Sequence, residues 1–285
     1  MPYSSSKGSA ALGVGLYLTG IFFFALNDAL GKWLVKDYGV GQLMMLRSVG
    51  AAIVLAPMVW RMRGELFDFR QGWLMAARIV VTAFDTFAFY WATRFMPLAD
   101  VMTFYMAAPL IATALSAPLL GERVEPFRWA AVCVGFVGVV VALRPTPGLF
   151  TWAALAALGG ASLFALGQTI TRKMRQTHWL PIVFWQFLGG GLIGAAATPW
   201  AWATPTGFDL ALMFLVGIVS MLCFICLSRA LAMARLAVLA PLQYSMIIWA
   251  AVMGWIVWRD VPTAPIWIGN AIIIGSGLFA AARSR

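Results

Sequence analysis

The sequence predicts an all-helical integral membrane protein in which ten transmembrane helices form two inverted five-helix repeats. Three observations support this fold class. The chain has 285 residues, of which 62% are hydrophobic and only 11% charged, whereas soluble domains carry about 25% charged residues. Its apolar runs are long enough to cross a bilayer, which takes roughly 20 residues each. Finally, residues 46–53 resemble residues 185–192, so the chain contains an internal repeat.

The internal repeat extends beyond this one stretch. Residues 24–26 and 164–166 both read Phe-Ala-Leu and occupy matching places in the two halves. Each half is expected to hold five spans, and an odd number of spans turns the second half upside down relative to the first. Inverted repeats that meet near the middle of the bilayer are typical of secondary transporters. We therefore expect a first repeat over 1–145 and a second over 146–285.

The ten spans follow from the positions of the apolar runs. These runs are too long and too continuous for the strands of a membrane barrel, which alternate apolar and polar residues. The turn at 94–97 is very short, so the third and fourth spans are expected to be antiparallel neighbours. The predicted spans are 10–33, 39–60, 73–95, 98–120, 127–144, 150–171, 180–198, 208–228, 236–258 and 265–282.

Lysine and arginine in the loops predict the orientation. With the N-terminus in the cytoplasm, thirteen Lys and Arg residues lie on the inner side and five on the outer side, as the positive-inside rule requires. Both termini are therefore expected in the cytoplasm of a bacterium, with the chain in the inner membrane. This distribution also accounts for the net charge of +10. The expected partners are anionic membrane lipids and a small-molecule substrate, not a nucleic acid.

Ionisable side chains inside the membrane are costly, and this makes them candidates for function. Arg47 and Asp85 are each about 12 Å from the outer edge of the bilayer, from a rise of about 1.5 Å per residue. Two interpretations of Arg47 are open: its guanidinium binds a substrate carboxylate, or it forms a buried salt bridge with Asp85. We expect the salt bridge in the resting state, where a substrate can compete with Asp85.

Two further ionisable residues are given structural interpretations. Asp28 is close to the predicted end of the first span, and Lys32 is its neighbour one helical turn later. We expect a helix-end ion pair there. Arg78 is close to the inner end of the third span, so its side chain is expected to reach the membrane surface.

Polar and aromatic residues near these charges complete the candidate site. Gln186 occupies the place of Arg47 in the second repeat, and its alternative role is a helix–helix hydrogen bond. Single aromatic residues more often pack than bind, but as a group they suit an apolar or aromatic ligand. Besides Arg47, Asp85 and Gln186, the candidate substrate-binding residues are Tyr90, Tyr105, Gln168, Trp185, Gln243 and Tyr244.

Two prolines predict hinges. Pro109 falls in the middle of the fourth span and Pro241 in the matching ninth span. Each removes a backbone hydrogen bond and bends its helix. Their matching positions indicate a pair of helices that move together.

Metal, cofactor and enzyme functions are not expected. Cys223 and Cys226 are one helical turn apart inside an apolar run, where cysteine most often packs as a small apolar residue. The chain has a single histidine, His178, which excludes most zinc sites and most base catalysis.

A pattern of small, proline and charged residues recurs in the two halves. In the first half it consists of Ala92, Arg94, 97–100 (Pro-Leu-Ala-Asp), Pro109, 120–123 (Leu-Gly-Glu-Arg), Gly135 and Gly138. In the second half it consists of Ala230, Ala237, Tyr244, Asp260, Trp267 and Gly277. With this pattern the chain resembles the drug/metabolite transporter superfamily in its EamA-type branch, and within that branch it looks similar to bacterial aromatic amino-acid exporters. The resemblance covers nearly the entire chain and implies a ten-helix carrier with a central cavity lined mainly by the first, third, fourth, sixth, eighth and ninth spans.

The sequence therefore predicts an exporter or facilitator of small metabolites that works by alternating access. Amino acids with apolar or aromatic side chains are the expected substrates. The alternative is an exporter of cationic drugs coupled to protons through Asp85, although an arginine partner would favour the charged form of that carboxylate. A lipid-handling protein is a third possibility, which would need a lateral groove. The oligomeric state is open, and a monomer is plausible.

Overall fold

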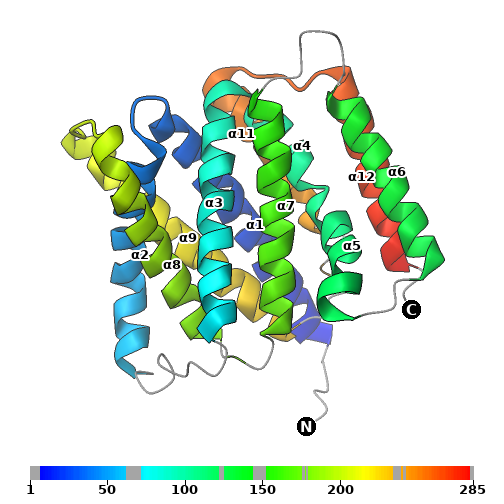
Figure 1. Ribbon diagram of the computed structural model, residues 1–285, viewed down its shortest axis with the longest axis horizontal. Coiled ribbons are helices and arrows are strands. Elements are labelled where there is room, and N and C mark those ends of the chain that lie inside the picture. The colour runs from blue at the N-terminus through cyan, green and yellow to red at the C-terminus, as the bar shows by residue number, and fades with distance from the viewer. Residues whose placement is uncertain are drawn as a thin grey trace.

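The computed structural model describes residues 7–61, 72–121, 125–143, 152–174, 177, 179–233, 239 and 242–282, and within these ranges the chain is helical with no strand. The helices run side by side in one bundle (Figure 1). α1 begins and α12 ends at the same edge of the bundle, as an even number of spans requires.

The helix bounds follow the predicted spans closely. The first half contains α1 (Lys7–Val35), α2 (Val40–Arg61), α3 (Gly72–Phe95), α4 (Leu98–Tyr105), α5 (Ala108–Leu120) and α6 (Pro126–Leu143). The second half contains α7 (Trp152–Lys173), α8 (Trp179–Ala197), the short helix η2 (Thr198–Trp200), α9 (Gly207–Met233), α11 (Ser245–Trp258) and α12 (Ala264–Ala282).

Seven helical stretches of the described chain are long and apolar enough to cross a membrane, and α4 and α5 together form one of them. Shorter apolar helices at Trp129–Ala142, Ser245–Trp258 and Ala264–Phe279 coincide with the remaining predicted spans. The prediction of an all-helical chain is therefore confirmed for the described residues, and seven long and three shorter apolar helices fit the ten predicted spans.

Several helix contacts of the first half have a counterpart in the second half. α1 packs on α9 just as α3 packs on α7, and α2 packs on α9 as α8 packs on α3. The contact of α5 with α7 likewise corresponds to that of α11 with α1. Three more pairs each join one helix of the first half to one of the second: α2 with α8, α4 with α11, and α6 with α12. The arrangement brings α1, α2, α3, α8 and α9 around one region of the bundle (Figure 1).

The fourth predicted span is broken in its middle. α4 ends at Tyr105, a turn follows at Met106 and Ala107, and α5 begins at Ala108. Pro109 occupies the first turn of α5, where a missing amide hydrogen costs least. The fourth predicted span is therefore interrupted just before Pro109 by a turn in which Met106 and Ala107 keep helical backbone angles. The matching Pro241 lies outside the described residues.

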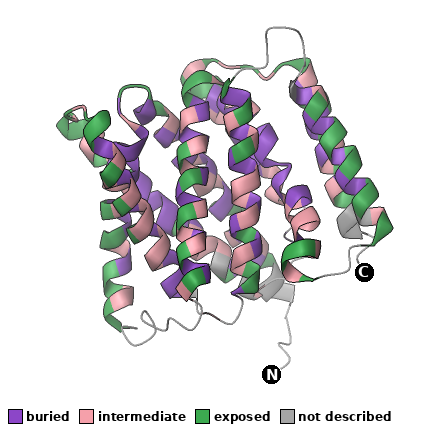
Figure 2. Cartoon of the chain, in the orientation of Figure 1, coloured by how far each residue is buried: buried purple, intermediate pink, exposed green. Residues whose placement is uncertain are grey.

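The surface of the bundle is apolar between its two ends. Figure 2 shows exposed residues along the outward faces of the helices and buried ones between them. Large tryptophans project at helix ends, among them Trp60, Trp73, Trp152 and Trp200, which are all at least 70% exposed. Aromatic rings at both ends of the spans are typical of the two membrane–water interfaces.

Candidate functional site

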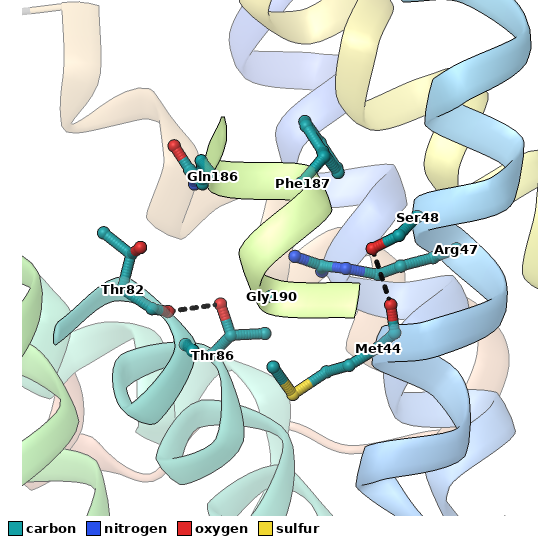
Figure 3. A pocket seen from close by; sticks show the side chains of 9 residues that line it. Met44, Arg47, Ser48, Thr82, Thr86, Gln186, Phe187 and Gly190 are labelled. Carbon is teal, nitrogen blue, oxygen red and sulfur yellow. Dashed lines mark hydrogen bonds between the residues drawn. The ribbon is translucent and has the colours of Figure 1, made fainter. Parts of the chain in front are cut away.

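A small pocket opens between α2, α3 and α8. It is narrow, with room for about one water molecule, and part of it is open to the surroundings. The Arg47 side chain reaches from α2 across to α8 at this pocket (Figure 3). Gln186, which the repeat aligns with Arg47, lines the same pocket. The other lining residues are Met44, Ser48, Thr82, Ala83, Thr86, Phe187 and Gly190.

Arg47 is fixed by close packing and by aromatic neighbours. Gly217 of α9 lies directly against the backbone carbonyl of Arg47, where a side chain of any size would overlap it. The guanidinium donates a hydrogen bond of 3.3 Å to the Tyr90 hydroxyl. Its carbon lies 5.7 Å from the centre of the Tyr90 ring and 5.9 Å from that of Phe187, within the range of cation–π attraction. Arg47 therefore keeps part of its donor capacity for a ligand.

A buried polar network continues from Tyr90 into α1 and α9. The Asn27 amide donates to the Tyr90 hydroxyl at 3.3 Å and to Asp28 at 3.0 Å. The Ser220 hydroxyl of α9 donates to the side-chain amide oxygen of Asn27 at 2.6 Å. Gly31 makes room for the Tyr90 ring, because a Cβ at that position would overlap it. The network thus ties α1, α2, α3 and α9 together behind the pocket.

The expected salt bridge between Arg47 and Asp85 does not form. The Asp85 carboxylate instead accepts a hydrogen bond of 2.7 Å from the Tyr105 hydroxyl of α4. The Tyr105 ring packs at 5.2 Å from Phe89 and 5.9 Å from Phe164. The depth estimate placed Arg47 and Asp85 at a similar level, but it contained no information on which way each side chain faces around its helix.

The expectation for Arg78 is also wrong. Arg78 is buried, with 7% of its surface exposed, and it does not reach the membrane surface. Its guanidinium donates to Thr171 at 2.7 Å, to the Gln186 side-chain oxygen at 2.9 Å and to the Ile182 carbonyl at 3.4 Å. Since Arg78 occupies the Gln186 oxygen, the amide N–H groups of Gln186 remain available as donors.

The ion pair expected between Asp28 and Lys32 is replaced by one between the two halves. Lys32 lies 3.3 Å from Asp260, which follows α11, and 4.6 Å above the Trp258 ring. The pair sits at the end of the bundle where α1 ends and α2 begins, here called the α1–α2 end. At the same end, in the loop between α1 and α2, the Tyr38 hydroxyl donates a hydrogen bond of 2.7 Å to the Asp209 carboxylate. This bond raises the pKa of Tyr38.

The remaining predicted residues stand apart from the pocket. Gln168 is exposed on α7, one turn after Phe164. Trp185 packs 5.4 Å from Phe184 within a separate apolar cluster. The Tyr244 hydroxyl lies against Gly277 of α12, and Gln243 is half-buried beside it.

Several residues of this region were not expected from the sequence. Asn27 and Asp28 interrupt an otherwise apolar run, and Ser220 is one polar residue in the middle of another. Thr82 and Thr86 are one helical turn apart on α3, a spacing that points both to one face. These patterns are detectable in the sequence, but they become informative only when the packing partners of each helix are known.

A bundle of apolar, membrane-length helices with a pocket between its two halves is typical of membrane carriers. The chain belongs to the EamA-like transporter family, whose model matches residues 11–144 and again 151–281. The EamA-type assignment made from the sequence is therefore confirmed. A solved crystal structure with 20% sequence identity has the same fold, with a TM-score of 0.69 over 98% of this chain and 99% of that one.

Several different substrates appear in the names of the curated relatives. A riboflavin transporter of Rhizobium johnstonii is 30% identical over 273 residues, covering 93% of this chain and 88% of the relative. An S-adenosylmethionine uptake transporter of Rickettsia bellii is 24% identical over 270 residues, covering 94% and 93%. The pseudopaline exporter CntI of Pseudomonas aeruginosa is 25% identical over 267 residues, covering 92% and 93%. The finer likeness to aromatic amino-acid exporters stays a prediction.

Proposed function

We propose that this protein carries small metabolites with an amino-acid head group and an apolar or aromatic body across the bacterial inner membrane. The observation that carries this proposal is the pocket that Arg47 and Gln186 line together. The two halves, 1–145 and 146–285, rock around this pocket as inverted repeats, with both termini in the cytoplasm. The turn before Pro109 supports such movement, because the helical hydrogen-bond ladder is incomplete between α4 and α5 and the chain can bend there.

The donors of the pocket suit a carboxylate. The Arg47 guanidinium is planar and always charged, and such a group binds a carboxylate through two parallel hydrogen bonds. The Gln186 amide adds N–H donors, because Arg78 already holds its oxygen. Phe187 lines the pocket as well and offers an apolar surface to the body of the substrate.

The acceptors of the pocket suit an ammonium group. Ser48 donates its hydroxyl hydrogen to Met44, Thr82 to Arg78 and Thr86 to Thr82, in each case to the backbone carbonyl one turn earlier at 2.8 Å. Figure 3 shows two of these bonds at the pocket wall. A hydroxyl whose hydrogen is used in this way presents its lone pairs to a ligand. Donors at Arg47 and acceptors on α2 and α3 together match the two charges of an amino acid.

The names of the relatives support this class and suggest one competitor. S-adenosylmethionine is itself an amino-acid derivative with a heteroaromatic body. Riboflavin, which names the relative at 30% identity, lacks the amino-acid head group but has a flat ring system with acceptor oxygens that Arg47 can bind. Riboflavin is therefore the second candidate substrate.

Counterflow in proteoliposomes tests the proposal. Vesicles loaded with unlabelled phenylalanine, tryptophan, S-adenosylmethionine or riboflavin receive the labelled compound outside, with no ion gradient. We expect saturable exchange of amino-acid compounds, competed by others with the same head group. Exchange of riboflavin alone would move the substrate to the second candidate, and no exchange of any of the four would refute the proposed class.

A further inference from the structure

We propose that Asp28 binds a proton that moves together with the substrate bound at Arg47. The inference rests on the proposed function, since it assumes a substrate with a carboxylate. It adds an energy source to the carrier, namely the proton gradient across the inner membrane. It also places that coupling site on α1, outside the pocket itself.

The Asp28 carboxylate is buried with half of its hydrogen-bonding capacity unused. Only 4% of the residue is exposed. One carboxylate oxygen accepts from the Asn27 amide at 3.0 Å, while the other has no hydrogen-bond partner among the described residues. A buried carboxylate without enough partners is costly as an anion. Binding a proton removes that cost.

The surroundings of Asp28 select a proton over a larger cation. Asp28 does not line the pocket at Arg47, so an organic ammonium bound there does not reach it. A metal ion such as Ca²⁺ or Mg²⁺ needs about six oxygen ligands. The side-chain oxygen of the adjacent Asn27 already accepts from Ser220 at 2.6 Å. A proton needs only the one free carboxylate oxygen.

Asp28 and Asp85 share one cation, Arg47, whose single positive charge cannot balance both carboxylates. Asp85 has a second source of stabilisation in the Tyr105 hydroxyl at 2.7 Å, which the free oxygen of Asp28 lacks. The other titratable groups facing this region are Tyr90 on α3, Tyr105 on α4 and Cys223 on α9, and α11 contributes none.

Substrate binding at Arg47 changes this charge balance. Both Arg47 and Asn27 donate to the Tyr90 hydroxyl at 3.3 Å, so one hydroxyl connects the pocket to Asp28. A carboxylate bound by Arg47 cancels the positive charge that Asp28 otherwise feels, and the proton then binds Asp28 more tightly. By linkage the bound proton strengthens substrate binding by the same factor. Proton and substrate are therefore carried in the same direction.

Gradient-driven accumulation in proteoliposomes separates this inference from the proposed function. Purified protein is reconstituted, and uptake of the labelled compound that gave counterflow is measured with and without an inward proton gradient. We expect an inward gradient of one pH unit to raise accumulation severalfold in the native protein, toward the limit of about tenfold that one proton per substrate allows. Asp28→Asn should show no gradient effect, yet should still exchange substrate, because counterflow needs no net proton movement.

Two carboxylate variants serve as comparisons. Asp209→Asn changes a residue in the first turn of α9 away from the pocket, and it should accumulate substrate as the native protein does. If Asp85→Asn loses the gradient effect and Asp28→Asn keeps it, Asp85 is the coupling site and the inference is wrong. Net accumulation that is unaffected by a proton gradient in a native protein that still shows counterflow would also refute it, while leaving the proposed function intact.

A measurement on the native protein covers the case in which Asp28→Asn does not fold. Adding substrate to detergent-solubilised protein in weak buffer should cause proton uptake at those pH values at which Asp28 is charged without substrate, rising toward one proton per bound substrate. Saturating substrate that causes no proton uptake at any pH at which the protein stays folded would overturn the inference without any variant.

Discussion

The Lys32–Asp260 pair offers the most detailed prediction, because it joins the two halves at the α1–α2 end of the bundle. The Lys32 nitrogen is 3.3 Å from the Asp260 oxygen, and the two side chains are 10% and 33% exposed. Asp100 of α4 also lies near this lysine. Removal of Lys32 therefore leaves two carboxylates facing each other and weakens the closed arrangement of α1, α4 and α11.

The magnitude follows from the geometry of the pair. At 3.3 Å the Coulomb attraction is about 5 kcal/mol in an effective dielectric of about 20. Desolvation cancels much of this, and the partial burial places the pair between an exposed bridge worth about 0–1 kcal/mol and a buried one that costs about 3–5 kcal/mol to break. A loss of about 1–3 kcal/mol increases the open population roughly 5- to 150-fold.

Thiol labelling measures this population. Thr103 is fully buried on α4, one turn beyond Asp100. A cysteine at position 103, in a background without the native cysteines, reacts with a soluble thiol reagent only when this end opens. In solubilised protein, Lys32→Ala should raise the labelling rate at least about fivefold. Lys36→Ala, which removes an exposed lysine just after the end of α1, should leave it unchanged.

A charge exchange decides between loss of the pair and loss of packing. The double variant Lys32→Asp with Asp260→Lys keeps the opposite charges and should return labelling most of the way to the native rate. A labelling rate in Lys32→Ala within twofold of the native rate would refute the reasoning, since it would mean that the pair does not hold this end closed.

Two further predictions concern packing and buried hydrogen bonds. Tyr105→Phe leaves the buried Asp85 carboxylate without its 2.7 Å partner. It should destabilise the protein by about 1–3 kcal/mol, measured as a lower melting temperature in detergent. Tyr38→Phe removes a hydrogen bond to Asp209, whose carboxylate is only partly buried, and should lower the melting temperature less; equal losses would contradict the difference in burial of the two carboxylates. Gly217→Ala forces a methyl group against the Arg47 carbonyl and should sharply reduce the yield of monodisperse protein, whereas Gly275→Ala has open space around it and should not; similar yields of the two variants would mean that α2 and α9 can separate without cost.

The helical architecture is largely predictable from the sequence. Apolar run length defines the spans, because a bilayer demands about 20 apolar residues from each crossing helix. Pro109 predicts the interruption between α4 and α5, since proline has no amide hydrogen for the helical hydrogen-bond ladder. The repeat also paired Arg47 with Gln186, and the two side chains line one pocket.

The partners of individual side chains are not predictable in the same way. Arg78 binds Thr171 and Gln186, which are 93 and 108 residues away in the chain. Asp28 was assigned to a helix end from its depth alone, yet the helices packed around α1 bury it. Depth along a helix follows from sequence spacing, but the direction of a side chain around the helix matters only once its neighbours are known.

Direct binding of the transported compound tests the central claim, that Arg47 holds the substrate. Affinity is measured by calorimetry on solubilised native protein, Arg47→Ala, Arg47→Lys and Arg94→Ala, which removes an exposed arginine at the end of α3. Truncating a charge partner costs about 2–5 kcal/mol, so Arg47→Ala should bind at least about tenfold more weakly, with Arg47→Lys in between. Arg94→Ala should bind normally, and all variants should melt within a few degrees of the native protein. Unchanged affinity in a folded Arg47→Ala protein would contradict the account.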